Sequence, residues 1–92
     1  MNPDWDAVGY VISSKYRLAV LRQLQDSPST PTAIADAEGM APSHISRAIG
    51  RLRRRSIVEL MVPETRRKVR PYALTPKGEA IWGAVCQAEL AK

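Results

Sequence analysis

Three prolines in this chain of 92 residues each stand where a helix can begin. They occur in the pairs Thr30-Pro31, Ala41-Pro42 and Thr75-Pro76. Proline suits the first position of a helix, because the N–H that it lacks has no partner there, but it breaks a helix interior. No helix can therefore run through any of these pairs. A chain of this length suffices for one domain, so we expect short helices packed on a single core over residues 1–92.

The apolar residues before the first of these pairs predict two helices. An N-terminal helical segment over residues 1–12 starts with Asn2-Pro3, a cap followed by proline. Ser13 or Ser14 caps a second helix, which is either separate from the first or continuous with it and ends before residue 27. The first helix carries Trp5, Val8 and Ile12 on one face. The packed side of the second consists of Arg17, Val20, Leu21 and Leu24.

Residues 31–55 predict two helices joined by a turn. The first is about two turns long and stops at Gly39, which suits the left-handed conformation at a helix end. The second begins at Pro42, although its cap, Ala41, offers no side-chain oxygen. Its apolar stripe is Ile45, Ala48, Ile49 and Leu52. Its outward side carries Ser43, His44, Ser46, Arg47, Gly50, Arg51 and Arg54.

The pattern changes to extended structure beyond Ser56. Residues 57–62 and 69–74 read as two strands, and the polar residues between them form a basic tip, so residues 57–74 make a hairpin. Pro71 suits an edge strand because it cannot donate a ladder hydrogen bond. The core side of the hairpin is expected to be Val58, Leu60, Tyr72 and Leu74. A last helix follows over residues 76–91.

Positive charge is concentrated in the second half of the chain. Nine of the fourteen Lys and Arg residues lie between Arg47 and Arg70, where the only acids are Glu59 and Glu64. This segment carries a net charge of +7, and because the whole chain carries +5, the remainder carries −2. One basic face on an otherwise acidic molecule is typical of a protein that meets a polyanion. The alternative is a solvated surface, which usually mixes both signs.

The predicted fold class is mainly α with a small antiparallel β-hairpin, in the order α-α-α-β-β-α with an extra N-terminal helical segment. This is the order of a winged helix-turn-helix. The segments TPTAIADAEGMAPSHISRAIGRL and RSIVELMVPETRRKVRPYALTPKGEAIW resemble the small winged helix-turn-helix regulators of archaea and the broader MarR, PadR and ArsR-like group. The resemblance implies a homodimer that binds double-stranded DNA. It places the helix after Pro42 in the major groove and the hairpin on the adjacent minor groove or backbone.

The resemblance and the chemistry of the side chains together predict roles for single residues. Base edges are expected to meet Ser43, His44, Ser46, Arg47 and Arg51, and Gly50 would allow a close approach to DNA unless it is merely tolerated. Phosphates are expected to meet Arg54 and Arg55 and the wing residues Arg66, Arg67, Lys68 and Arg70. Thr30 and Thr32 form a further phosphate site with the free N–H groups of their helix, and simple capping is the alternative.

The two ends of the chain hold more apolar side chains than a small core needs. We expect a dimer interface between the first and last helices, formed by Trp5, Val8, Ile12, Trp82, Val85, Cys86 and Leu90. The alternative is that the two tryptophans fold back on their own domain. Cys86 could be a redox sensor or form a disulfide across the dimer, but we expect a small buried residue.

Other functions find little support in the residue types. His44 is the sole histidine and has no neighbouring ligand or nucleophile, so neither an enzyme, a metal site nor a cofactor is expected. The lone cysteine and the lack of an apolar leader predict a cytoplasmic protein with no membrane contact. Nothing identifies a small-molecule effector. The alternatives are a winged-helix protein-interaction module, a nonspecific architectural DNA-binding protein and, more weakly, an RNA-binding protein.

Overall fold

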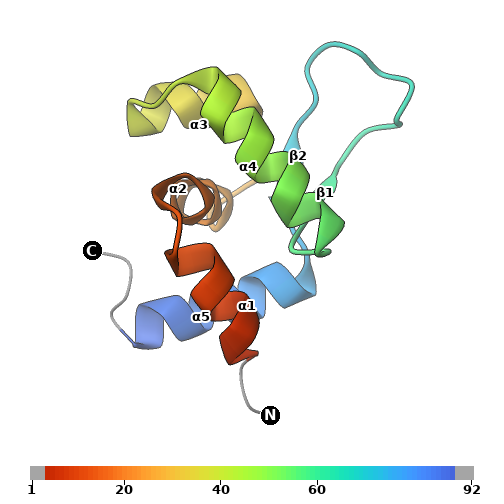
Figure 1. Cartoon of the computed structure of the whole chain (residues 1–92). Helices are drawn as coiled ribbons and strands as arrows, with labels where there is room; N and C mark the ends of the chain where they lie inside the picture. Colours follow the sequence, from red (N-terminus) through yellow and green to blue (C-terminus); the bar gives the residue numbers. More distant parts are fainter. Residues whose placement is uncertain (1–3, 89–92) are drawn as a thin grey trace.

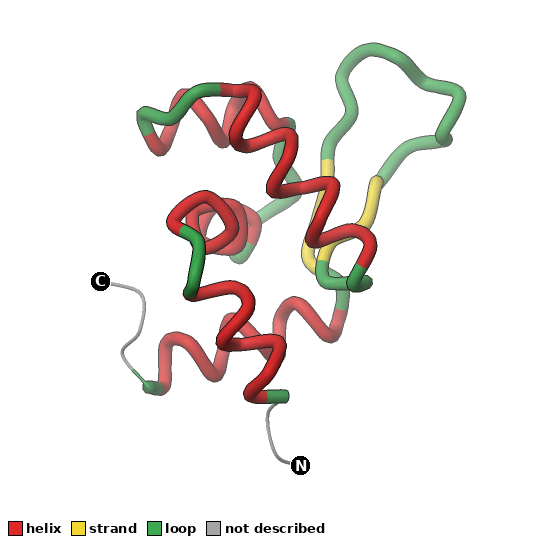
Figure 2. Tube along the Cα trace, viewed as in Figure 1, coloured by secondary structure: helices red, strands yellow, loops and turns green. Residues whose placement is uncertain are grey.

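The computed structural model describes residues 4–88 and arranges them in the predicted order of helices and strands (Figure 1; Figure 2). In chain order the elements are α1 (Trp5–Ile12), α2 (Lys15–Leu24), α3 (Pro31–Glu38), α4 (Pro42–Arg54), β1 (Val58–Leu60), β2 (Tyr72–Leu74) and α5 (Pro76–Gln87). The predicted fold class, mainly helical with one antiparallel hairpin, is confirmed.

Side chains at the helix starts explain where the helices begin. The side chains of Asp4, Ser14, Thr30 and Thr75 each accept a hydrogen bond from a backbone N–H three residues on, which satisfies a donor that has no partner within the helix. Ala41 makes no such bond before α4, as expected. The cap at Ser14 makes α1 and α2 separate helices. The start predicted at Asn2-Pro3 lies outside the described residues, and α1 instead begins after Asp4.

The buried face of α1 differs from the predicted one. Ala7, Val8 and Val11 are the buried residues, whereas Trp5 is 57% exposed and Ile12 is 37% exposed. Both sets repeat at helical spacing, so periodicity alone does not choose between them. The choice is made by packing, because α1 lies against α5 and α2 and turns its smaller side chains toward them.

The hairpin is shorter than its sequence pattern predicts. β1 and β2 pair in antiparallel fashion, with Val58 opposite Leu74 and Leu60 opposite Tyr72, and residues 61–71 form the long loop between them (Figure 2). On its other edge, Tyr72 exchanges two backbone hydrogen bonds with Ser29, of 2.8 and 3.0 Å. The base of the hairpin is therefore fixed to the segment that leads into α3.

The core lies where α2, α3 and α4 meet and continues to α1 and α5. All four residues of the predicted α4 stripe are at most 5% exposed, and the α2 residues Val20, Leu21 and Leu24 join them. Arg17, predicted on the same side of α2, is only half-buried. Gly39 ends α3 with a φ of 64°, the left-handed conformation that glycine adopts without strain. Within residues 4–88, no helix is long and apolar enough to cross a membrane.

Among the glycines, Gly78 has the least room for a side chain. It is buried in the first turn of α5, and a Cβ there would overlap the Ile57 carbonyl oxygen and approach Leu74 Cδ2 to 3.2 Å. Gly83 lies on the same helix, and a Cβ there meets no atom within 4 Å. The two glycines therefore form a matched pair, of which one is required by packing.

We expect Gly78→Ala to lower the free energy of unfolding by about 1–3 kcal/mol, because the helix or the Ile57 backbone must shift. Gly83→Ala should instead raise the free energy of unfolding by up to about 1 kcal/mol, since alanine is the better helix former. Urea unfolding followed by circular dichroism measures both changes. Equal effects of the two substitutions would show that the contact at Gly78 is not tight.

Candidate nucleic-acid interface

The outward side of α4 carries the residues that the sequence singled out. Ser43, His44, Ser46, Arg47, Gly50, Arg51 and Arg54 are all exposed. They lie opposite the buried stripe because a helix advances 100° per residue. A Cβ on Gly50 would meet no atom of the chain within 4 Å, so nothing inside the protein requires glycine there. The close approach of DNA at Gly50 stays a prediction.

Three separate elements meet at a hollow of about 570 Å³, which we call the wing hollow. It lies between the start of α3, the outward side of α4 and the loop of the hairpin. Its lining residues are Thr30, Pro31, Thr32, Ser46, Arg67, Val69 and Arg70. The structure thus brings together residues from all three predicted contact groups. Val69 is 70% exposed and has a φ of 54°, a conformation that β-branched residues rarely adopt.

Thr30 and Thr32 occupy different positions at the start of α3. Thr30 caps the helix, since its Oγ1 accepts a hydrogen bond of 3.2 Å from the Ala33 N–H. The capping alternative is therefore confirmed for Thr30. Thr32 is exposed on the first turn, at the edge of the wing hollow. A phosphate contact at either residue remains a prediction.

Glu64 connects the loop of the hairpin to α4. Its carboxylate forms an ion pair with Arg53 of α4 and lies 3.5 Å from Arg70 Nη2. Arg70 also donates a hydrogen bond of 3.2 Å to the Arg66 carbonyl oxygen, and it is half-buried. Arg70, predicted to hold a phosphate, thus helps to shape the loop. Arg66, the neighbouring Arg67 and Lys68 are exposed, as a contact with a ligand requires.

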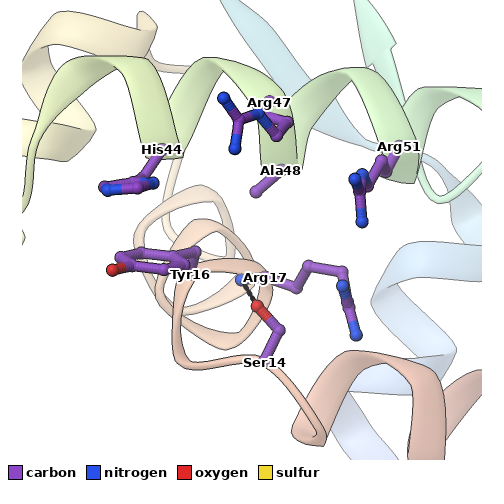
Figure 3. Close-up of a pocket in the computed structure, with 7 residues that line it drawn as sticks. All are labelled: Ser14, Tyr16, Arg17, His44, Arg47, Ala48 and Arg51. Carbon is purple, nitrogen blue, oxygen red and sulfur yellow. Dashed lines mark hydrogen bonds between the residues drawn. The ribbon is translucent and has the colours of Figure 1, made fainter.

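A second hollow, of about 260 Å³, lies on the other flank of α4, and we call it the α2–α4 hollow (Figure 3). It is lined by Ser14, Tyr16, Arg17, His44, Arg47, Ala48 and Arg51. His44 stacks on Tyr16 there, with ring centroids 4.6 Å apart and planes inclined by 13°. His44, predicted to meet base edges, therefore has its ring packed on α2.

Tyr10 of α1 links this region to the end of α4. Its ring lies between two guanidinium groups, with Arg17 Cζ 3.9 Å and Arg55 Cζ 3.7 Å from the ring centroid. Arg55, predicted to hold a phosphate, thus stacks on an aromatic ring, although it is exposed as a residue. No sequence pattern predicted a site role for Tyr10, Tyr16 or Arg17. The one signal for them was an arginine at an apolar position of the second helix.

Within residues 4–88, no group of three or more His, Cys, Asp or Glu side chains is placed to hold a metal ion.

Residues 5–91 match the family described as the HVO_A0261 N-terminal domain. The chain belongs to this family. The match covers all the elements described above, including both hollows.

Solved structures of regulators, two of them named as members of the MarR family, share the fold of this chain. The MarR family transcription regulator SP03579 aligns with a TM-score of 0.76 at 26% identity, over 94% of this chain and 60% of its own. NMB1585, a MarR family regulator from Neisseria meningitidis, aligns with a TM-score of 0.73 at 21% identity, over 83% and 54%. The adhesin competence repressor AdcR from Streptococcus pyogenes aligns with a TM-score of 0.72 at 17% identity, over 83% and 57%.

These alignments confirm the predicted resemblance to MarR-like winged helices. The chain spans less than two thirds of the length of each of these regulators. No protein of curated function matches its sequence.

Two residues of the predicted dimer interface lie in the core of their own chain. Val8 and Val85 are 1% and 0% exposed, so neither offers surface to a partner in this arrangement. The cause is the packing of α1 on α5, which buries these side chains. Cys86, expected to be buried, is exposed. Trp5 and Ile12 are exposed, Trp82 is half-buried against the core, and Leu90 lies outside the described residues.

We expect Glu64→Gln to loosen the loop of the hairpin while leaving the core intact, because its ion pairs join the loop to α4. The free energy of unfolding should fall by at most about 1 kcal/mol, since the Glu64 side chain is 64% exposed in both pairs. Hydrogen exchange should be faster in residues 61–71 only. Glu59→Gln removes the same charge from an exposed acid without an ion pair in the described part of the chain, and it should leave exchange unchanged. Equal rates of hydrogen exchange in the two variants would show that Glu64 does not hold the hairpin loop against α4.

Proposed function

We propose that this chain is a sequence-specific regulator of transcription that binds double-stranded DNA as a homodimer. In this proposal α4 enters the major groove, and the hairpin loop, the wing, contacts the backbone or the adjacent minor groove. The fold shared with MarR-family regulators supports the class of function. The observation that carries the proposal is the wing hollow, where basic and hydroxyl side chains from three elements converge.

The shape of this hollow suits one strand of a duplex. A major groove about 12 Å wide admits a helix, and a sugar-phosphate strand separates it from the next minor groove. With α4 in the major groove and the wing at the minor groove, that strand runs between them, through the wing hollow. There it meets Thr32 with its backbone N–H at the start of α3 on one side and Arg67 on the other.

The residue types on the outward side of α4 favour contacts with base edges over contacts with phosphates alone. Arg47 can donate two parallel hydrogen bonds to a guanine, which discriminates against other bases by about 1–3 kcal/mol. Ser43 and Ser46 are short hydrogen-bonding residues near the start of the helix, where a recognition helix meets bases. A protein-interaction module is disfavoured, because such a surface is enriched in aromatic and aliphatic residues and this one is not.

A dimer would supply the contacts that one small domain lacks. Two copies on half-sites about one helical turn apart double the number of bases read. α1 and α5 pack side by side at the end of the molecule away from α3 (Figure 1). The exposed Trp5 and Ile12 and the half-buried Trp82 are the apolar side chains that we assign to the interface.

We expect Arg47→Ala and Arg67→Ala to affect DNA binding in different ways. Arg47→Ala should erode the preference for sequences that the wild type selects from random duplexes, by about 1–3 kcal/mol. Arg67→Ala should weaken binding to all duplexes alike and reduce the magnitude of the slope of log K against log salt by about 0.9. Lys77→Gln, on α5 outside both hollows, is the matched loss of one charge.

Selection at two salt concentrations, followed by binding isotherms, tests this division of roles. If both variants lose specific and nonspecific binding in the same ratio, the roles are wrong. If the wild type enriches no sequence but still binds, the protein is a nonspecific architectural one.

We expect the wild type to sediment as a dimer at micromolar concentration and Trp5→Asp as a folded monomer, because a buried charge would disrupt an apolar interface. Met61→Asp places the same charge at an exposed apolar residue of the wing and should leave the dimer intact. A monomeric wild type would remove the homodimer from the proposal.

A further inference from the structure

The α2–α4 hollow concentrates positive charge without an acid to balance it. Arg17, Arg47 and Arg51 line it, and its lining includes no Asp or Glu. Among residues 4–88 none of the three forms an ion pair, whereas Arg22, Arg53 and Arg70 each do. Like charges at this separation on a helix repel one another, as Arg47 and Arg51 do one turn apart. Such a cluster is stabilised by an anion.

Arg17 is held in place before any ligand arrives. Its Nε donates a hydrogen bond of 2.8 Å to the Tyr10 carbonyl oxygen, and its Nη2 donates one of 2.8 Å to Ser13 Oγ. Arg17 Cζ also lies over the Tyr10 ring, 3.9 Å from its centroid, and Arg55 Cζ lies 3.7 Å from the same centroid. Nη1 has no hydrogen bond within the described residues. A fixed guanidinium with free donors loses little conformational entropy when it binds an anion.

The two hollows lie on opposite flanks of α4. Ser46 belongs to the wing hollow, whereas His44 and Arg51 point toward α2 (Figure 3) and Arg47 lines the same hollow. A major groove is bordered by two sugar-phosphate strands. If the wing hollow takes one of them, the other passes on the flank where Arg17 and Arg51 stand.

We propose that the α2–α4 hollow binds a phosphate group of the second DNA strand, with Arg17 and Arg51 as its ligands. This inference rests on the proposed function. Arg17 donates to the phosphate oxygens, and Tyr10 is a positioning residue that acts through Arg17. The Tyr16–His44 stack closes one end of the hollow and joins α2 to the helix that lies in the groove. The protein thereby contacts both sugar-phosphate strands that border one major groove.

The test compares Arg17→Gln with wild type on one duplex that the wild type binds. Loss of one phosphate contact should reduce the slope of log K against log salt by about 0.9 and lower affinity roughly eightfold at 0.1 M salt. The preference among sequences should not change, because phosphates carry no base identity. Lys77→Gln is the control for net charge. Circular dichroism shows that each variant is folded at the temperature of the assay.

Substitutions of Tyr10 test the positioning of Arg17 without changing the charge of the protein. Tyr10→Phe keeps the ring and should bind as the wild type does. Tyr10→Leu removes the stacked ring and should weaken binding without changing the charge of the protein. In the double variant with Arg17→Gln the two losses should not add, since Tyr10 acts through Arg17. Additive losses would remove Tyr10 from the site.

The outcomes distinguish a failure of this phosphate site from a failure of the proposed DNA-binding function. If the wild type binds DNA and Arg17→Gln keeps its affinity and salt slope, the second strand does not enter this hollow. If Lys77→Gln lowers the affinity for DNA as much as Arg17→Gln does, the loss reflects the net charge of the protein, and the proposed phosphate site is wrong. If the wild type binds no duplex, the proposed function fails, and the site with it.

Discussion

Burial of one side of α4 is the interaction on which the rest of the structure depends. Its four apolar residues are at most 5% exposed against α2 and α3. Because a helix turns through 100° per residue, a stripe fixed inward also fixes the direction of every other side chain on that helix. The polar residues of α4 therefore face outward together, and a hollow forms on each flank where α2 or the wing comes near.

Two acids hold this arrangement in place by pairing across elements. Glu64 joins Arg53 of α4 to Arg70 of the wing, and Glu38 at the end of α3 accepts hydrogen bonds from Arg22 and the neighbouring Gln23 of α2. These pairs neutralise basic groups that stabilise the fold. Among residues 4–88, the three arginines at the α2–α4 hollow are among those that these pairs leave without an acid, so positive charge stays there where an external anion can reach it.

The order of elements and most helix starts could be predicted because their causes are local. A cap, a proline or a left-handed glycine acts within one turn of its own position, as at Thr30, Pro42 and Gly39. The face of α1 could not be predicted, since both sets of residues repeat at helical spacing and only α5 decides between them. The length of the strands was also overestimated, because pairing of residues 58–60 with 72–74 depends on a partner distant in the sequence.

The candidate site divides in the same way. By itself the sequence determined that one helix carries a polar outward side and that a basic loop follows it, because periodicity and charge are properties of one segment. Only the tertiary structure decided that Tyr10, Arg17 and Arg51 share one region and that Glu64 restrains the wing. Such contacts join residues of different elements, and they form only because a common core holds those elements against one another.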